Sequence, residues 1–414
     1  MNNNFYTRDN CRYCKSKNLV EFLNLGNQAP SNSFIDEKDF ENEESFPLKL
    51  SLCNDCYLVQ LRDVVSGSDI FDDYYYLSSS SKALVRHFEE MTSDISVQYQ
   101  ITDGDVVVDI GCNDGITLDA YDNNRLCKIG VEPSNAGEIA SEKGHKVYKD
   151  FFGKEVANNI VENHGVAAVV TATNVFAHVD NMDGFIEGIP LLIKDSGIFV
   201  VELSYLPKML DSNMFDVIYH EHLCYLSLHP LIPYLANYDL EVFHVEELDM
   251  GASGPAIRFY IKHIDNKIKV NTSVQAMIEY ERSWGITSIN KYKDFSSRVF
   301  EIKSKTLDMI NKIIADGGSI GGFGAPAKGN TLLNFLELDE SQISKISENN
   351  KKKIGKYTPG SHIEVISDEE FIENNFDYAL LLAWNYKDFF LSNSDYIKEG
   401  GRFIIPFPTP HVEQ

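Results

Sequence analysis

Short apolar runs that alternate with helix-like stretches fill the middle of the chain. The residues from Val106 to Ile110 are mostly apolar, and they stop at a turn that begins with Gly111 and ends with Gly115. The next stretch, 116–126, carries apolar residues at helical spacing, so we predict a strand, a tight turn and a helix in that order. The pattern repeats in three further short apolar runs, at 128–131, 168–171 and 197–203. This alternation predicts a doubly wound α/β fold.

A second cycle of the same kind lies near the end of the chain. Residues 319–330 again pass from an apolar run through a glycine turn to a helix-like stretch, and later strand candidates stand at 343–347, 378–383 and 402–406. Residues 274–314 between the two cycles have a charged helical pattern, which predicts a linker helix or a helical pair. Another helix is expected over 82–99, with Ser80 or Ser81 as its cap. The chain is therefore predicted to contain two nucleotide-type α/β domains.

The first glycine turn carries acids at the positions that a nucleoside cofactor uses. Asp109 closes the first strand, and Glu132 closes the next one, where a carboxylate can accept both ribose hydroxyls. Gly111 and Gly115 lack the intermediate glycine of the G-x-G-x-x-G pattern of dinucleotide-binding proteins. This combination favours S-adenosylmethionine over a dinucleotide.

Four of the seven cysteines form two C-x-x-C pairs near the N-terminus, Cys11 with Cys14 and Cys53 with Cys56. Two such knuckles supply four thiolates to one tetrahedral ion, for which zinc is the natural occupant. Because all four positions are cysteine, no position remains for water and the ion is expected to be structural. The segment between the pairs must form its own hairpin or loop. Four thiols without a metal are the alternative.

Composition narrows the classes of partner. The chain has 414 residues and a formal net charge of −25, which argues against a general nucleic-acid surface. Its longest apolar stretches are too short to span a bilayer, and its start lacks the pattern of a secretory signal. We therefore expect a cytoplasmic protein with no membrane partner.

A row of ionisable side chains follows the fourth strand candidate. Tyr219, His220, Glu221 and His222 combine a phenol, two imidazoles and a carboxylate, the groups needed to remove a proton near neutral pH and to stabilise the resulting enolate. The histidines stand at i and i+2, which does not match the i, i+4 spacing of H-E-x-x-H metal sites. A solvated loop with one packed histidine is the alternative interpretation.

At this point the chain resembles, over nearly its whole length, the sugar C-methyltransferases of deoxysugar pathways, which methylate C3 of a nucleotide-linked 4-keto-6-deoxyhexose. The resemblance rests on the cysteine pairs and on the segments at 74–79, 108–115, 130–134, 174–178, 219–222, 324–330 and 359–360. It implies a zinc-binding module at 1–70, a central class I methyltransferase Rossmann-like domain at 71–265 and a C-terminal Rossmann-like sugar-nucleotide-binding domain at 266–414.

The resemblance also implies roles for individual residues. His222 is expected to be the general base, with Tyr219, Glu221 and His178 grouped around the ketosugar. The residues expected to bind S-adenosylmethionine are Asp109, Gly111, Cys112, Asn113, Gly115, Glu132, Pro133 and Asn174. The sugar nucleotide is expected to contact Tyr76, Lys328 and Asn330. Thymidine diphosphate is the first choice of nucleotide, and guanosine or cytidine diphosphate stays open.

The second glycine turn admits more than one interpretation. Residues 322–327 fit G-x-G-x-x-A and Glu348 ends the next strand candidate, so in isolation the segment would pass for an NAD site. We interpret it as a phosphate cradle in which Lys328 and nearby amides neutralise a diphosphate; a structural turn is the alternative. The rival functions are a sugar O-methyltransferase, an NAD-dependent oxidoreductase acting on a nucleotide sugar, and a zinc-dependent binding module.

Overall fold

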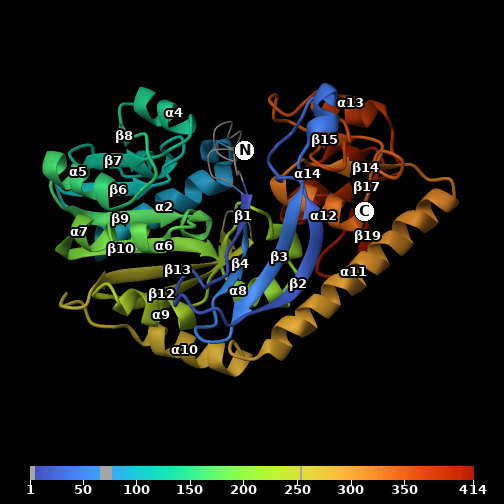
Figure 1. Ribbon diagram of the computed structural model, residues 1–414. Helices are drawn as coiled ribbons and strands as arrows, with labels where there is room; N and C mark the ends of the chain where they lie inside the picture. The colour runs from blue at the N-terminus through green and yellow to red at the C-terminus, as the bar shows by residue number, and fades with distance from the viewer. Residues whose placement is uncertain (1–4, 66–76, 252–253) are drawn as a thin grey trace.

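The computed structural model describes residues 5–65, 77–251 and 254–414. Two α/β lobes lie side by side, and strands from the N-terminal part of the chain run between them (Figure 1). The first lobe holds a seven-stranded sheet and the second a six-stranded sheet. The predicted α/β fold, with a cysteine-bearing N-terminal module and a second Rossmann-like domain, is confirmed.

The central lobe is built on one mostly parallel sheet with the strand order β12-β13-β10-β9-β6-β7-β8. Strand β13 runs in the opposite direction to the other six strands. The strands are β6 (Val106–Ile110), β7 (Cys127–Val131), β8 (Lys146–Tyr148), β9 (Ala167–Thr173), β10 (Ile193–Ser204), β12 (Leu240–Gly251) and β13 (Gly254–His263). The strand order reverses beside β6, and ligands of open α/β sheets bind at such a switch point, beyond the carboxyl ends of the strands.

The helices of this lobe follow the predicted pattern with one exception. They are α2 (Lys82–Gln98), α3 (Ile116–Asp119), α4 (Ala136–Glu142), α5 (Lys154–His164), α6 (Met182–Ile186), α7 (Ile189–Leu192), α8 (Leu206–Asp211) and α9 (Leu228–Ala236), with 3-10 turns η2 (Ser78–Ser80), η3 (Phe176–His178) and η4 (Phe215–Val217). Ser81 caps α2 as expected, because its side chain accepts a hydrogen bond from the Leu84 amide. The helix expected over 116–126 was predicted too long. It ends at Asp119, and Asn123 then accepts a hydrogen bond from the Arg125 amide, a local bond that competes with helix.

The N-terminal module is a small β-structure that borrows a strand from the central lobe. Its sheet has the order β11-β4-β3-β2, and β1 (Phe5–Thr7) pairs separately with β5 (Asp63–Val65). The sheet consists of β2 (Leu19–Gln28), β3 (Phe46–Cys53), β4 (Val59–Leu61) and β11 (Cys224–Tyr225), and the short helix η1 (Glu37–Asn42) lies between β2 and β3. The hairpin of β2 and β3 fills the segment between the two cysteine pairs, as expected.

The C-terminal lobe has a parallel sheet with one antiparallel edge strand, in the order β16-β15-β14-β17-β18-β19. Its strands are β14 (Ile320–Phe323), β15 (Ile346–Glu348), β16 (Val365–Ser367), β17 (Tyr378–Leu381), β18 (Arg402–Ile405) and β19 (His411–Glu413). Its helices are α12 (Ala327–Leu336), α13 (Asp368–Glu373), α14 (Lys387–Asn393) and α15 (Asp395–Lys398), with the 3-10 turn η5 (Trp384–Tyr386). The predicted strand at 343–347 forms three residues later than expected, because Ile343 belongs to the turn before β15.

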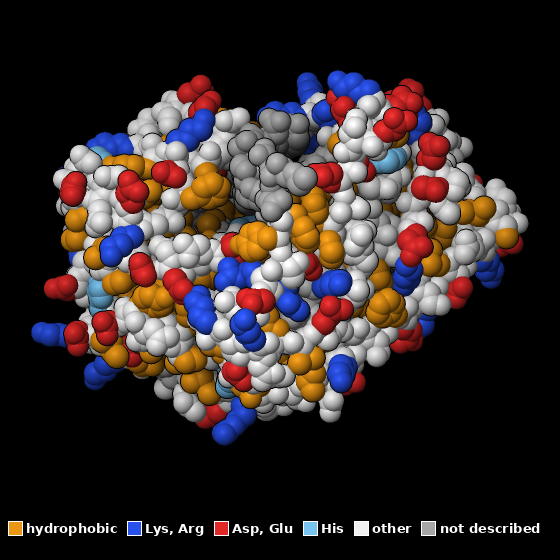
Figure 2. Space-filling model, viewed as in Figure 1, with side chains coloured by type: hydrophobic (Ala, Val, Ile, Leu, Met, Phe, Trp, Pro, Cys, Tyr) orange, Lys and Arg blue, Asp and Glu red, His pale blue; other side chains and the backbone are white. Residues whose placement is uncertain are grey.

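The charged segment between the lobes forms a helical pair, one of the two arrangements predicted from its sequence. Helix α10 (Thr272–Trp284) packs on the central lobe, and the long α11 (Ile289–Ala315) runs along the outside of the molecule (Figure 1). Acidic side chains are interspersed with basic ones over the face shown in Figure 2. Among the described residues, no helix has the length and apolar character to cross a membrane.

Two large apolar cores join the parts of the molecule. One core contains side chains of β2, β3 and β4 together with side chains of α11 and the C-terminal sheet. The other contains Cys11, Tyr13 and Cys53 of the cysteine knuckles together with the sheet of the central lobe. The N-terminal module is therefore packed into both lobes, and the domain limits 1–70, 71–265 and 266–414 stay a prediction.

Candidate active site

The first glycine turn forms a tight cradle at the carboxyl end of β6. Gly111 has φ +68°, and a Cβ atom there would lie 2.2 Å from Val175 Cγ2. Gly115 has φ +84°, and a Cβ atom there would lie 3.0 Å from His145 Cδ2. Asn113 also has a positive φ, a conformation that asparagine tolerates better than most residues. This backbone accepts no larger side chain at Gly111 without moving the loop from β9.

Three acidic side chains surround this cradle. Glu132 accepts hydrogen bonds from the Asn113 and Ser134 amides, each at 2.9 Å. Asp109 is buried and accepts a hydrogen bond from Thr171 Oγ1 at 2.5 Å, and its burial raises its pKa to about 7. Asp114 Oδ1 is buried and has no hydrogen-bond partner among the described residues.

These observations fit S-adenosylmethionine. A buried carboxylate oxygen without a partner calls for a donor, and the cofactor brings ribose hydroxyls, an amino group and a sulfonium charge. Glu132 and Asp109 would face such donors, and the tight turn that Gly111 allows would place the ligand beside them.

The remaining predicted cofactor residues lie around the same turn but contribute differently. The Cys112 side chain packs with Leu118 and Ala140, so a contact with the cofactor would come from its backbone. Asn174 has φ +57°, and its amide donates to Glu202 O at 2.7 Å, which fixes the loop after β9. Pro133 directly follows Glu132 and is half-buried.

Two predicted catalytic histidines come together from distant parts of the chain. His178 ends η3, and His222 precedes β11; their ring centroids are 4.9 Å apart with an interplanar angle of 69°. His222 Nδ1 donates a hydrogen bond to Val217 O at 2.7 Å, which leaves Nε2 as the acceptor of the neutral imidazole. Burial lowers the pKa of His222 to about 3, with a further contribution from His178. Burial also lowers the pKa of His178 to about 4. Both rings are therefore neutral near pH 7, the form in which an imidazole accepts a proton.

The other members of the ionisable row do not all face the same way. The Tyr219 ring lies against His222, with centroids 4.0 Å apart. Glu221 is buried and accepts a hydrogen bond from Asn32 Nδ2 of the N-terminal module at 2.7 Å, and burial raises its pKa to about 7. His220 turns away, and its Nε2 donates to the carbonyl oxygens of Phe46 and Pro47 in β3. Of the row, Tyr219 lies against His222 of the histidine pair, Glu221 is held by the N-terminal module, and His220 anchors the segment to β3.

The second glycine turn is already occupied by side chains of the protein. The Ala325 amide donates to Glu348 Oε2 at 3.2 Å, and the Lys353 ammonium donates to Ala325 O at 2.8 Å. Lys328 is buried, and it lies 4.7 Å from the centre of the Trp384 ring. Burial lowers the pKa of Lys328 to about 8. A carboxylate therefore holds the amide at Ala325, and positive charge near this turn comes from two lysines.

Of the two other predicted substrate residues, the structure describes only Asn330. Asn330 is buried, and its Nδ2 donates to Ser31 O of the N-terminal module at 2.7 Å, while its Oδ1 has no hydrogen-bond partner among the described residues. Tyr76 lies outside the described residues, so its predicted contact stays a prediction.

Two polar groups near the site were not anticipated from the sequence. Asn32 holds Glu221, and the charges of Glu221 and Glu348 both act on Lys353. Asn32 and Lys353 each belong to a different module from Glu221. No local pattern in the sequence marks such a long-range partner.

The four predicted zinc ligands converge on one point. All four sulfur atoms lie within 4.8 Å of one another, and the Cys11–Cys56 and Cys14–Cys53 pairs of sulfurs are each 3.5 Å apart. A zinc–sulfur bond of roughly 2.3 Å places tetrahedral sulfurs about 3.8 Å apart, so the donor set fits zinc.

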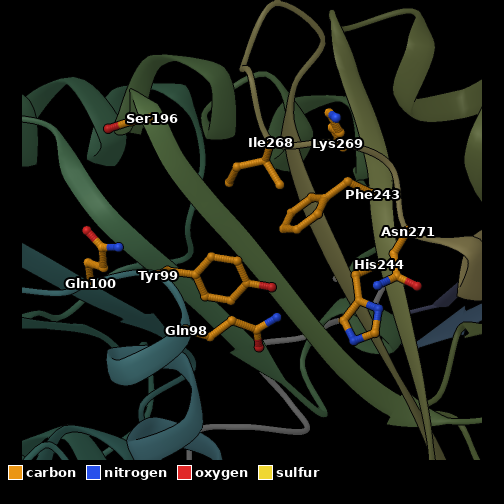
Figure 3. Close-up of a pocket in the computed structure, with 9 residues that line it drawn as sticks. All are labelled: Gln98, Tyr99, Gln100, Ser196, Phe243, His244, Ile268, Lys269 and Asn271. Carbon is orange, nitrogen blue, oxygen red and sulfur yellow. The ribbon is translucent and has the colours of Figure 1, made fainter.

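An open pocket with a volume of about 400 Å³ lies at the other end of the central sheet (Figure 3). It is lined by Tyr99 after α2, Ser196 near the start of β10, and Phe243 and His244 near the start of β12. These positions are at the amino ends of the parallel strands. The pocket is therefore separate from the cradle at the carboxyl end of β6.

Comparisons with known proteins agree with this geometry. Three family models match the chain: a zinc binding domain over residues 11–71, a methyltransferase domain over 86–245 and a C-methyltransferase C-terminal domain over 251–408. The chain is 32% identical over 407 residues to the C-methyltransferase NovU of Streptomyces niveus, and the alignment covers 98% of this chain and 96% of that relative.

Solved structures align less closely. An S-adenosylmethionine-dependent methyltransferase of Clostridium acetobutylicum is 11% identical, and the match covers 43% of this chain and 92% of that chain with a TM-score of 0.35. A second such methyltransferase, of Anabaena variabilis, is 16% identical, and its match covers 42% and 84% with a TM-score of 0.33.

Proposed function

The chain belongs to the S-adenosylmethionine-dependent C-methyltransferases, and we propose that it methylates C3 of a nucleotide-linked 4-keto-6-deoxy sugar by way of an enolate. The resemblance of its motifs to those of the sugar C-methyltransferases supports the class of substrate. The observation that carries the proposed chemistry is the contact between His178, His222 and Tyr219.

A carbon atom must gain negative charge before it can accept a methyl group. Bound S-adenosylmethionine supplies an electrophilic methyl group on a sulfonium. The C4 ketone of the proposed substrate makes the neighbouring C3 proton acidic enough for an imidazole to remove. His222 suits this step because Val217 O fixes its Nδ1 as a donor and leaves Nε2 to accept the proton.

The developing enolate needs a donor at O4. Tyr219 lies against His222 and carries a phenolic hydroxyl, so we assign it this role, with His178 as the second candidate. Glu221 directly precedes His222 and is held by Asn32, which suits a supporting role in orienting the segment. Since methyl transfer needs alignment more than acid–base help, holding both ligands side by side would supply much of the rate.

The zinc ligands and the second lobe have separate proposed tasks. Cys11, Cys14, Cys53 and Cys56 would hold a structural zinc ion. Lys328 and Asn330, together with Lys353, would hold the sugar nucleotide. Thymidine diphosphate is our first choice, with guanosine and cytidine diphosphate as the other two. Because Glu348 already engages the Ala325 amide, this turn offers a dinucleotide one amide fewer.

Mass spectrometry tests the proposal. The full-length protein is incubated with S-adenosylmethionine and a 4-keto-6-deoxy sugar linked to thymidine, guanosine or cytidine diphosphate. We expect a gain of one methylene, with loss of deuterium from a substrate deuterated at C3. Methylation that retains this deuterium would indicate transfer to oxygen or to C5, the other carbon beside the ketone, and would refute methylation at C3. No gain on any ketosugar would refute the proposed substrate class.

A further inference from the structure

A buried arginine of the first zinc knuckle reaches into the central lobe. Arg12 lies between Cys11 and Cys14, and its side chain is fully buried. Its Nε donates to Asp180 Oδ1 at 3.0 Å, and its Nη2 lies 3.0 Å from the same oxygen. Asp180 follows His178 by two residues. The knuckle therefore holds the loop that carries one of the two site histidines.

The same loop is gripped by two more residues of the N-terminal module. Arg8 Nη1 donates to Asp180 Oδ1 at 3.0 Å, and the Tyr6 hydroxyl donates to Asp180 Oδ2. Burial opposes ionisation of Asp180, but Arg12, Tyr6 and Arg8 together hold its pKa below the usual range. Asp180 is thus a charged anchor for three side chains of one module.

Arg12 is also tied to β4, the strand that pairs with the segment directly after the second histidine. Its backbone N and its Nη1 donate to Gln60 Oε1 at 3.1 and 3.2 Å, and Nη1 also donates to Leu61 O. Gln60 pairs with Cys224 of β11, and the Leu61 amide donates to Leu223 O at 2.9 Å. His222 directly precedes this paired segment.

The two histidine segments also touch each other at this point. The Leu223 amide donates to Ala177 O at 2.8 Å, so the residue after His222 is bonded to the residue before His178. Arg12 spans both sides of this bond. We propose that Arg12 and Asp180 are positioning residues, through which the zinc knuckle sets the geometry of the His178–His222 pair. This inference rests on the proposed function, because it takes the pair to be the reacting site.

Docking of the knuckle does not depend on Arg12 alone. Tyr13 stacks on Tyr234 of α9 with ring centroids 3.9 Å apart, and Lys15 forms an ion pair with Asp183 of α6 at 2.5 Å. The chain therefore offers a matched control. Lys15→Gln breaks a partly exposed knuckle-to-lobe ion pair and the hydrogen bond from Lys15 Nζ to Arg12 O at 2.6 Å, but it leaves the guanidinium of Arg12 in place, whereas Arg12→Gln breaks the buried ion pair.

The test uses the full-length protein and four variants: Arg12→Gln, Arg12→Lys, Asp180→Asn and Lys15→Gln. Zinc content and the thermal midpoint show whether each variant is folded and loaded. NMR of ¹⁵N-labelled histidines reads the surroundings of His178 and His222 without any substrate. Steady-state kinetics then separates kcat from KM, and washout of C3 deuterium without S-adenosylmethionine reads proton removal alone.

We expect Arg12→Gln and Asp180→Asn to keep zinc, to shift the His178 and His222 signals, and to lower washout and kcat by about 100-fold with little change in KM, as for a misplacement of roughly 1 Å. Arg12→Lys should restore part of the rate, since it returns the charge without the fork of donors. Lys15→Gln should leave the signals and the rate as in the wild type.

Unmoved histidine signals and an unmoved kcat in zinc-loaded Arg12→Gln and Asp180→Asn would overturn the inference. If Arg12→Gln does not fold, Asp180→Asn decides alone, since its side chain is part-exposed and remains an acceptor. If the wild type methylates no ketosugar, the proposed function fails, and the histidine signals still decide whether the knuckle sets the geometry of the pair.

Discussion

In both glycine turns of this protein, a backbone amide donates a hydrogen bond to a carboxylate of the neighbouring strand, but the charged side chains around the two turns differ. In the central lobe, Glu132 at the end of the second strand accepts the Asn113 amide of the turn. In the C-terminal lobe, Glu348 at the end of the corresponding strand accepts the Ala325 amide. Each turn is thus closed by a carboxylate from the neighbouring strand. The shared fold accounts for this likeness and does not by itself choose a ligand.

The side chains around each turn make the difference. The first turn adds Asp109 and Asp114, whereas the second adds Lys328 and Lys353. An acidic cradle suits a cationic sulfonium ligand, and a cradle with two lysines suits an anionic diphosphate. The comparison teaches that a glycine pattern locates a turn, while the charges that the fold brings to it indicate the ligand.

A methyl group added at each turn should separate the two sites most strongly. Gly111→Ala forces a left-handed backbone and a contact of 2.2 Å with Val175, which together cost about 2–4 kcal/mol. We expect the Kd for S-adenosylmethionine to rise by at least about 30-fold. In Gly324→Ala, with φ +78° and a contact of 3.0 Å with Ala383, binding of S-adenosylmethionine should stay unchanged. Calorimetric titration of both variants measures this, and equal losses would break the comparison.

Replacing the carboxylate that closes each turn by an amide should further separate the two ligand sites. Glu132→Gln removes a charged acceptor for ribose, so affinity for S-adenosylmethionine should fall by about 10-fold or more. Glu348→Gln should leave that affinity unchanged and alter only the KM for the sugar nucleotide. Initial rates with each substrate varied in turn distinguish the two cases. A rise in the KM for S-adenosylmethionine in Glu348→Gln would contradict separate ligand sites.

Neutralising the lysines should weaken the anionic site alone. Lys328→Gln and Lys353→Gln should each raise the KM for the sugar nucleotide by about 10-fold, since each loses a charge-assisted hydrogen bond to phosphate. The control is Lys345→Gln, in which the lost lysine pairs with Glu364 and Glu370 on the surface. Thermal midpoints guard against unfolding, because Lys328 is buried. An equal rise in KM in Lys345→Gln would contradict the assignment of Lys328 and Lys353 to the sugar-nucleotide site.

The pH dependence of cofactor binding should be the smallest effect. Burial raises the pKa of Asp109 to about 7, so its carboxyl gains charge as the pH rises through 7. A cationic ligand favours the ionised form, and affinity for S-adenosylmethionine should therefore rise by up to about 10-fold per pH unit below 7 and level off above it. Titrations from pH 6 to 8 measure the slope, and Asp109→Asn should flatten it. An affinity for S-adenosylmethionine that falls with rising pH would contradict the prediction that ionised Asp109 favours binding.

The local parts of the fold could be predicted from the sequence, whereas the contacts between modules could not. The strand at 106–110, the Ser81 cap and the cysteine cluster follow from patterns within a few residues. The two-residue strand β11 is too short to leave a pattern, and it exists because β4 pairs with it. For the same reason, nothing local predicted that His220 would turn toward β3.

The candidate site shows the same division. The sequence placed His222 in a reactive row, and the resemblance added His178, but their contact depends on the packing of η3 against β11. Asn32 and Lys353 act on Glu221 from other modules, and each is one polar residue among many in the sequence. The occupation of the second turn by Glu348 was also hidden, because the pattern G-x-G-x-x-A is the same whether its amides face a ligand or a side chain.

Washout of deuterium from C3 tests the central claim most directly. The deuterated ketosugar is incubated with the wild type, with His222→Ala and with His244→Gln, a control whose histidine lines the pocket at the other end of the sheet. The account predicts loss of deuterium and gain of a methyl group on C3 in the wild type and the control. His222→Ala should slow both by about 10²- to 10⁴-fold while still binding S-adenosylmethionine. Methylation at C3 at an undiminished rate in His222→Ala would contradict the account.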